Sequence, residues 1–288
     1  MASQTEETLL DIRNLGVAFR TESGDLPAVR DVSFALGRER LAIVGESGSG
    51  KSTIMRALLG LLPANATVTA ERARFTAEDG QVDLLKLGPN GLRRIRGRQI
   101  AMVVQDPKQG LNPSQRIGRQ VEEMIRLHRP TIRRSELRDR AVEALADVHI
   151  HRPGTVIDLL PHQVSGGMAQ RVMIAMMLAG SPKVLIADEA TSALDAVVQH
   201  RILELIETKV RQLGMGLILI SHDLDLVGRY ADRILVMYRG RVLERLEGVD
   251  PLSGAAHPYT KGLLACRPKA GDFGQFLPTL ERDPAWLR

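Results

Sequence analysis

The feature that most constrains the fold is a glycine-rich segment directly after a short apolar run. Residues 41–44 are Leu-Ala-Ile-Val, which is typical of a buried strand, and residues 45–52 are Gly-Glu-Ser-Gly-Ser-Gly-Lys-Ser. In this pattern the glycines let the backbone curl so that N–H groups face phosphate oxygens, and the following helix adds its positive end. That helix is expected over residues 52–62, because its apolar spacing stops at Pro63. Strand, loop and helix together predict a phosphate site in an α/β fold.

Individual residues of the loop suit different parts of a nucleoside triphosphate. Lys51 can reach the β- and γ-phosphates, and the Ser52 hydroxyl can ligate Mg²⁺. A plain Gly/Ser-rich linker would not be expected to stand between a buried strand and a helix. The candidate nucleotide-binding residues are Gly45, Glu46, Ser47, Gly48, Ser49, Gly50, Lys51, Ser52 and Thr53.

Two carboxylates follow a second apolar strand far downstream. Residues 184–187 are Val-Leu-Ile-Ala, and Asp188 and Glu189 come next. Ligands bind at the carboxyl ends of the strands in open α/β sheets. We therefore expect Asp188 to hold Mg²⁺ and Glu189 to polarise an attacking water. An apolar strand that ends in acids is weak evidence alone, but together with the phosphate loop it favours nucleotide hydrolysis.

Strands and helices alternate in the second half of the chain, which predicts a parallel sheet with helices on both faces. Residues 8–44 are instead expected to form short strands with a turn at Gly24 and Pro27, and residues from about 106 to 160 a helical insert. Beyond Gly248 the chain is rich in Pro and Gly and is expected to be an appendage. The predicted helices are 167–180, 196–213 and 223–230, and the predicted strands are 100–104, 184–187, 217–220 and 234–237.

Composition excludes several classes of protein. Hydrophobic residues make up 44% and charged residues 25%, which is ordinary globular usage rather than that of a disordered chain or a fibre. No apolar run approaches the roughly 18 residues of a membrane-spanning helix. The first residues lack the basic-then-apolar order of a secretory signal, and the single cysteine, Cys266, cannot form an intramolecular disulfide. We expect a soluble cytoplasmic protein.

The formal charge of +5 comes with arginine clusters at residues 93–98 and 129–140. A basic face can attract nucleic acid, anionic lipid or nucleotide. Aromatic residues are only 3%, however, so the stacking platforms of single-strand binders are scarce. Solvated helix faces are the simpler interpretation, and no nucleic-acid partner is expected.

A third motif resembles the signature of a known protein family. Residues 164–171, Val-Ser-Gly-Gly-Met-Ala-Gln-Arg, resemble the LSGGQ signature of ABC (ATP-binding cassette) ATPases. Further motifs follow the order of that family: Gln105 after a strand, Ser-Ala-Leu-Asp at 192–195, and His222 after a strand. Phe19 lies upstream, where the family places an aromatic residue that stacks on adenine. A half-buried strand aromatic is the alternative interpretation of Phe19.

Shorter patterns resemble one subgroup, the importer ATPases for dipeptides, oligopeptides and nickel or metallophores. They are Gln-Asp-Pro at 105–107, Leu-Asn-Pro at 111–113, Pro-His-Gln at 161–163 and His-Pro-Tyr-Thr at 257–260. Three residues depart from the general family pattern: Met168 stands where Gln is usual but is familiar in this subgroup, and Ala169 and Ala190 replace the usual Arg and Pro.

The resemblance covers about residues 8–247 and implies the fold. The implied class is α/β: a P-loop NTPase ABC nucleotide-binding domain with an antiparallel β subdomain, a RecA-like parallel-sheet core and a helical signature subdomain. The domain would span residues 1–248, with the helical subdomain inserted at about 106–180. Residues 249–288 would form a C-terminal extension of the oligopeptide/nickel importer type. With Cys266 as the only cysteine, that extension is expected to lack an Fe–S cluster.

The resemblance also implies a head-to-tail dimer that encloses two ATP molecules with Mg²⁺. Glu189 would be the general base, His222 would contact the γ-phosphate, and Gln105 would sense Mg²⁺ and report to the helical subdomain. Asp195 would couple the two sites across the dimer. The signature residues expected to contact the partner's ATP are Ser165, Gly166, Gly167 and Met168, and the expected Mg²⁺ ligands are Ser52, Gln105 and Asp188.

The implied function is the ATP-hydrolysing subunit of a binding-protein-dependent ABC importer on the inner face of the cell membrane. It would power uptake of di- or oligopeptides, or of nickel or metallophores. Expected partners are two transmembrane permease subunits, a second ABC ATPase subunit, with a heterodimer favoured over a homodimer, and indirectly a periplasmic or lipoprotein substrate-binding protein. Two alternatives stay open: an ABC-like accessory subunit of a phosphonate-degrading complex, and a DNA- or ribosome-associated ABC ATPase.

Overall fold

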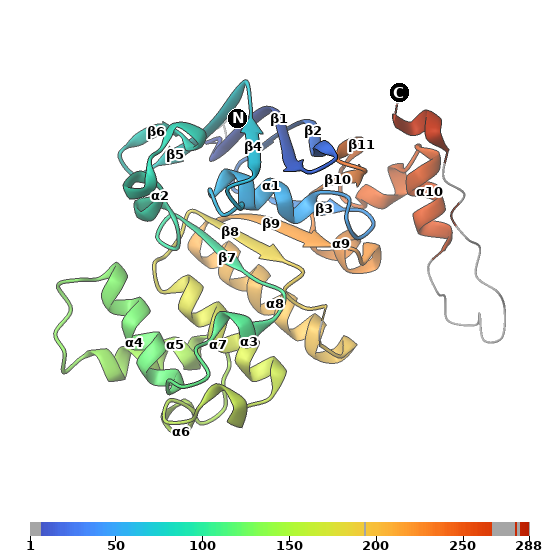
Figure 1. Cartoon of the computed structure of the whole chain (residues 1–288). Helices are drawn as coiled ribbons and strands as arrows, with labels where there is room; N and C mark the ends of the chain where they lie inside the picture. The colour runs from blue at the N-terminus through green and yellow to red at the C-terminus, as the bar shows by residue number, and fades with distance from the viewer. Residues whose placement is uncertain (1–6, 193, 267–279, 281–282, 288) are drawn as a thin grey trace, which may run out of the picture. The chain divides into compact units, whose positions relative to one another are not determined.

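The structure is a computed structural model that describes residues 7–192, 194–266, 280 and 283–287 (Figure 1). The chain divides into two compact units. The first unit contains residues up to Leu10, Leu36–Glu39 and Arg74–Ile218. The second contains Asp11–Ala35, Arg40–Ala73 and the residues from Leu219 onward. The domain boundary predicted at residue 248 stays a prediction.

The first unit holds most of the helices. Helices α4, α5 and α7 pack on one another, and α7 also contacts α8 (green to light orange in Figure 1). Helices α3 to α7 lie within the range 106–180 that is predicted to form a helical subdomain. The helices of this unit are α2 (Pro89–Ile95), α3 (Pro107–Gly110), α4 (Ile117–His128), α5 (Leu137–Asp147), α6 (Pro153–Val156), α7 (Gly166–Leu178) and α8 (Ala196–Leu213), with short 3-10 turns at Leu84–Lys86 and Pro161–Gln163.

The strands of the first unit include a parallel pair. Strands β7 (Ile100–Val103) and β8 (Val184–Asp188) run parallel, with Ile100 opposite Val184. Every residue of β8 is buried, as expected of a parallel strand that is covered on both faces. Strand β5 (Arg72–Ala77) forms an antiparallel pair with β6 (Gly80–Asp83). The parallel pair places Asp188 at the carboxyl end of a rigid strand.

The second unit contains both antiparallel and parallel strands. Strand β10 pairs in parallel with β3 and antiparallel with β11, and β1 pairs antiparallel with β4. Strand β9 (Gly216–Ser221) runs through the boundary at Ile218. The other elements are β1 (Leu10–Thr21), β2 (Gly24–Leu36), β3 (Arg40–Val44), β4 (Ala66–Thr69), β10 (Arg233–Tyr238), β11 (Arg241–Glu247), α1 (Lys51–Leu58), α9 (Leu224–Tyr230), α10 (Pro258–Ala265) and the 3-10 turns Pro251–Gly254 and Pro284–Leu287.

One predicted turn is wrong. The chain reverses at Glu22 and Ser23, whereas Gly24 and Pro27 lie inside β2. Strand β2 is at the end of its sheet, and at an edge the missing N–H of a proline removes no hydrogen bond from the ladder. The helix predicted at 196–213 is confirmed with those bounds as α8. Strands β4, β5, β6 and β11 were not predicted.

Hydropathy along the helices bears on membrane insertion. Within the described part of the chain, no helix is both long and apolar enough to cross a bilayer.

Gly118 of α4 tests how tightly the helical part of the first unit is packed. Its N–H donates to the Ile157 carbonyl oxygen at 2.8 Å, and a Cβ at this position would lie only 2.7 Å from that oxygen. We expect Gly118→Ala to lower the free energy of unfolding by about 1–3 kcal/mol, because the added atom overpacks a backbone contact. Denaturant unfolding monitored by circular dichroism measures this change.

Gly154→Ala in α6 is the matched control, because a Cβ there meets no atom within 4 Å. That variant should unfold at the wild-type denaturant concentration or slightly above it, since alanine restricts the unfolded chain. Equal stabilities of the two variants would show that the Gly118 contact is not tight.

Candidate functional site

The phosphate loop of the second unit packs closely against the backbones of the neighbouring strands β2 and β10. Gly45, Gly48 and Gly50 have φ values of 148°, 78° and 99°, a region that glycine adopts without strain. A Cβ at Gly50 would lie 2.6 Å from the Ala28 carbonyl oxygen of β2, and a Cβ at Gly45 would collide with the Met237 carbonyl of β10. Gly45 and Gly50 are therefore required by the packing of the loop as well as by its curvature, whereas Gly48 is required by the curvature alone.

Lys51 lies inside this loop at the start of α1. Its side chain is only 4% exposed, and its Nζ donates to the carbonyl oxygens of Gly45 at 2.8 Å and Glu46 at 2.9 Å. Gly50, the N-cap residue of α1, supplies no side-chain cap. A buried ammonium at a helix N-terminus forms a positively charged cradle, and phosphate is the anion that such a cradle suits.

Two other predicted site residues also belong to the second unit. His222 is exposed in the short turn between β9 and α9. The turn is held by Ser221, whose Oγ accepts from the Asp223 N–H at 2.9 Å, and by Asp223, which caps α9. Phe19 is half-buried on β1, opposite Ala66 of β4. The structure thus places Phe19 on a strand, and its stacking role stays a prediction.

The predicted carboxylates belong to the first unit. Asp188 is the last residue of β8 and is 4% exposed. Glu189 follows it, is half-buried, and has a φ of 48°. A non-glycine residue is uncommon in this left-handed region and persists only where surrounding contacts hold it. The backbone at Glu189 is therefore set by its neighbours.

Ser192 supplies those contacts, and sequence reasoning gave it no role. Its N–H and its Oγ both donate to the Glu189 carbonyl oxygen at 3.1 Å, and its Oγ accepts from the Gln105 Nε2 at 3.1 Å. Gln105 is thereby joined to the turn that carries Glu189, across 87 positions of sequence. A serine three residues after Glu189 is a recognisable turn signal, but its contact with Gln105 has no local signature.

The signature residues lie at the start of α7. Ser165 is its N-cap, and its Oγ accepts from the Met168 N–H at 3.3 Å. Ser165 and Gly166 are exposed, so this helix N-terminus faces solvent. A Cβ at Gly167 would lie 2.8 Å from Val198 of α8, so only glycine allows the two helices to approach this closely.

The segment after Ser192 packs beside the signature. Asp195 caps α8 by accepting from the Val198 N–H at 3.0 Å, and Leu194 lies 3.6 Å from the position of a Cβ on Gly166. Ala193 lies outside the described residues. The first unit therefore brings together Gln105 with Glu189, and the signature with Asp195, while the second unit carries the phosphate loop, His222 and Phe19.

The predicted Mg²⁺ ligands offer a hydroxyl, an amide oxygen and a carboxylate, from Ser52, Gln105 and Asp188. Among the residues that the structure describes, no group of three or more His, Cys, Asp or Glu side chains could hold a metal. Mg²⁺ commonly binds through one or two carboxylates together with waters and substrate phosphates. The oxygen chemistry of the predicted set fits that mode of binding.

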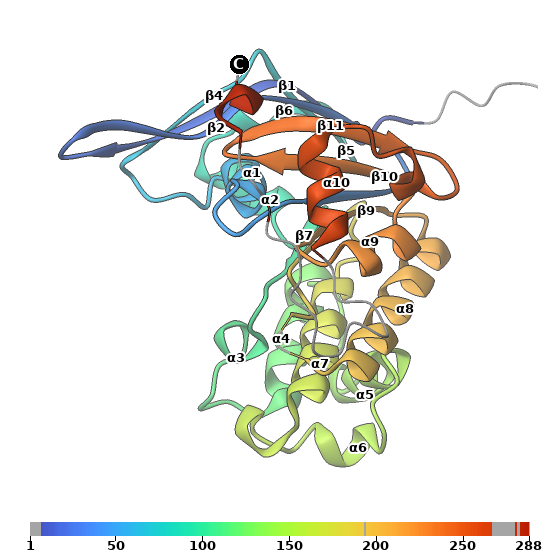
Figure 2. The same cartoon turned by 90° about the vertical axis from the view of Figure 1, so that its right-hand side faces the viewer.

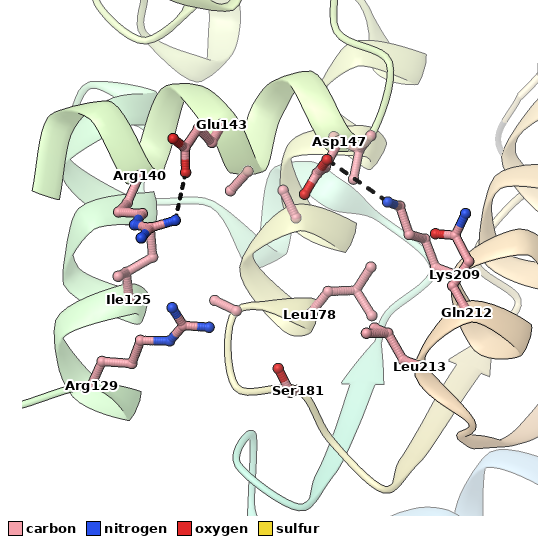
Figure 3. A pocket seen from close by; sticks show the side chains of 14 residues that line it. Ile125, Arg129, Arg140, Glu143, Asp147, Leu178, Ser181, Lys209, Gln212 and Leu213 are labelled. Carbon is pink, nitrogen blue, oxygen red and sulfur yellow. Dashed lines mark hydrogen bonds and ion pairs between the residues drawn. The ribbon is translucent and has the colours of Figure 1, made fainter. Parts of the chain in front are cut away.

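A separate cavity of about 260 Å³ lies among α4, α5, α7 and α8 in the first unit (Figure 3). Its rim carries two ion pairs, Arg140 with Glu143 at 2.9 Å and Lys209 with Asp147 at 3.9 Å. Leu178 lies on its apolar wall. Among the described residues that line it, none belongs to the predicted nucleotide-site motifs, although Arg129 and Arg140 belong to the second arginine cluster. It is a cleft between helices and is distinct from the candidate site.

The order and local geometry of the motifs agree with a comparison against known families. A family model described as ABC transporter matches residues 29–192. The chain belongs to the ABC transporter family. The predicted α/β fold class is confirmed, and as an ABC ATPase the chain binds and hydrolyses ATP.

Individual relatives of this ABC protein agree over most of its length. A protein of Brucella abortus, provisionally named a peptide import ATP-binding protein, is 47% identical over 273 residues, covering 94% of this chain and 81% of the relative. The oligopeptide transport ATP-binding protein OppD of Escherichia coli is 40% identical over 285 residues, covering 99% and 83%. A solved dimer of the ATP-binding cassette MJ0796 with ADP and Pi aligns with a TM-score of 0.71 at 26% identity, covering 83% and 98%.

The contact between Gln105 and Ser192 can be tested by substitution. We expect Ser192→Ala to lower kcat by about 2- to 12-fold, the effect of one lost hydrogen bond, while the Kd of ATP stays within twofold. Steady-state ATPase kinetics and equilibrium ATP binding measure the two quantities. Ser192→Thr keeps the hydroxyl and should restore turnover; equal loss in both variants would contradict a role for the hydroxyl.

Proposed function

We propose that this chain is the ATP-hydrolysing subunit of an ABC importer that powers the uptake of peptides across a cell membrane. The observation that carries the proposal is its similarity to import proteins over nearly the whole chain, at 40% identity to the oligopeptide transport protein OppD. A glutathione import ATP-binding protein of Pectobacterium atrosepticum is 43% identical over 277 residues. Glutathione is itself a small peptide. These names favour peptides over nickel or metallophores as the transported class.

The proposed roles follow from the chemistry of the residues. Lys51 and the first amides of α1 bind the β- and γ-phosphates, and Phe19 stacks on adenine. Ser52, Gln105 and Asp188 hold Mg²⁺, which when bound neutralises charge on the phosphates. Glu189 accepts the proton of the attacking water, and His222 contacts the γ-phosphate.

The exposed N-terminus of α7 supports a role in a dimer. Ser165 and Gly166 are exposed there, and a 13-residue helix presents partial positive charge at its start. We place the γ-phosphate of an ATP bound by a second ABC subunit against Ser165, Gly166, Gly167 and Met168. Asp195, the N-cap residue of α8, couples the two sites. A heterodimer is favoured over a homodimer, because subunits of this subgroup commonly work as related pairs.

A groove in the helical part of the first unit is a candidate docking site for a helix of a permease. It has a volume of about 710 Å³ and runs along α4 beside residues 110–115 and Met176 of α7. Met124 and Leu127 line it, and Leu127 is 62% exposed although it is apolar. We assign this groove to a cytoplasmic helix of a permease. Two such permeases would form the transport path, and a binding protein would deliver the substrate to them. This role places the chain on the inner face of the membrane.

The catalytic assignment is tested by Glu189→Gln. Loss of the proton acceptor should lower ATP turnover by at least 100-fold, while ATP binding persists and the dimer accumulates. ATPase kinetics and size-exclusion chromatography with ATP measure these effects. Lys51→Ala is the contrasting variant, since removal of the charge in the phosphate cradle should weaken ATP binding itself. Wild-type turnover in Glu189→Gln would exclude Glu189 as the general base.

The transport assignment is tested by a tagged pull-down from detergent-solubilised membranes of the source organism. Mass spectrometry should identify two multi-span permeases and a second ABC subunit. Leu127→Glu, which places a charge in the proposed docking groove, should reduce permease recovery while ATPase activity of the isolated chain is kept. Recovery of soluble lyase subunits or ribosomes alone would leave the ATPase intact and exclude the importer.

A further inference from the structure

The C-terminal helix α10 reaches the phosphate loop through one buried tyrosine. The Tyr259 side chain is 0% exposed, and its hydroxyl accepts a hydrogen bond from the Glu46 N–H at 3.2 Å. The two residues are 213 positions apart, yet both belong to the second unit. No motif of the nucleotide site predicts this contact.

The contact acts on a single peptide group. The N–H of Glu46 and the carbonyl of Gly45 belong to the same planar peptide. Its N–H donates to Tyr259, and its carbonyl accepts from the Lys51 Nζ at 2.8 Å. A rotation of this peptide would break both hydrogen bonds. The orientation of the peptide and the position of the Lys51 ammonium therefore depend on each other.

Tyr259 is itself held by a cluster of rings. The Tyr259 ring centroid lies 4.8 Å from that of Tyr238 and 5.6 Å from that of Trp286, and Trp286 also lies 5.9 Å from the His257 ring. Tilted and edge-on aromatic pairs at these separations are favourable. Figure 2 shows α10, in red, alongside β10 and β11 of the same unit. The ring of Tyr259 is thus fixed independently of its hydroxyl.

The start of α10 is anchored to β11 by a carboxylate. Glu244 Oε1 accepts from the N–H groups of Ala256 at 2.6 Å and His257 at 2.9 Å, and His257 Nδ1 accepts from the Tyr259 N–H at 3.1 Å. Burial would raise the pKa of Glu244, but the Thr260 side chain, the N–H groups of Ala256 and His257 and the neighbouring His257 ring together outweigh it and hold the pKa below its usual value. The anion that anchors α10 is therefore present at neutral pH.

We propose that Tyr259 is a positioning residue of the nucleotide site. Its hydroxyl holds the Gly45–Glu46 peptide in the orientation that keeps Lys51 placed for the phosphates, without touching the nucleotide. This inference rests on the proposed role of the loop in binding the phosphates of ATP. It gives the C-terminal extension a specific task, namely to set the affinity of the site for ATP.

Tyr259→Phe tests the proposal, because it keeps the ring and removes only the hydroxyl. We expect the Kd of ATP, measured by equilibrium binding of a fluorescent ATP analogue and by competition with ATP, to rise about 2- to 12-fold. The KM should rise in parallel, with kcat within about twofold of wild type. A hydroxyl that served only the stability of the fold would shift the unfolding midpoint and leave the Kd unchanged.

Tyr238→Phe is the matched control. Tyr238 belongs to the same ring cluster, where it contacts Tyr259 and the Arg239 guanidinium, and it should keep the wild-type Kd. Glu244→Ala is a second test, because it removes the carboxylate that anchors the start of α10 and leaves the Tyr259 side chain itself unchanged. The Kd of ATP should rise in this variant as well. A wild-type Kd in Tyr259→Phe would overturn the proposal, whatever the Kd of Glu244→Ala.

The same experiment separates this inference from the proposed function. If the wild-type chain binds and hydrolyses ATP while Tyr259→Phe has the same Kd, only the positioning role fails. If Lys51→Ala binds ATP as well as the wild type does, the assignment of the loop itself fails. The emission of Trp286, the single tryptophan of the chain, should be unchanged in Tyr259→Phe, as expected if the ring cluster is kept.

Discussion

The hydrogen bonds of the buried Lys51 ammonium are the interaction on which the phosphate loop of the second unit depends. A charge that is 4% exposed is costly unless it is partnered, and Lys51 is partnered by two carbonyls of its own loop. Those carbonyls are available only because the glycines let the loop curl between β2 and β10. Loop curvature, strand packing and lysine burial are therefore one arrangement, and a change in any of them would move the ammonium.

The first unit relies on a different device, namely backbone geometry set by short polar side chains. Ser192 holds the left-handed Glu189 and connects it to Gln105. Ser165 and Asp195 cap the two helices that meet at Gly167. Each cap satisfies an amide that the helix leaves unpaired and also fixes where the helix begins. Glu189, the proposed general base, and the signature thus lie on segments whose backbone is determined by neighbouring serine and aspartate side chains.

Sequence reasoning succeeded where the relevant contacts are local. The phosphate loop, the strand before Asp188 and the bounds of α8 follow from spacing within ten to twenty residues, and these elements are present. It failed at the turn assigned to Gly24 and Pro27, because edge position in a sheet cannot be read from composition. It also gave no role to Ser192 or Tyr259, whose partners lie 87 and 213 positions away.

The sequence by itself determined the family, the order of the motifs and the chemistry of each candidate residue, because glycine, lysine and carboxylates at these spacings have few other uses. Only the tertiary structure decided which residues support the loop. The physical reason is that a hydrogen bond such as that from the Glu46 N–H to the Tyr259 hydroxyl depends on how β10, β11 and α10 pack. Packing brings together segments that are distant in the chain, and a local pattern of residues does not predict which segments will meet.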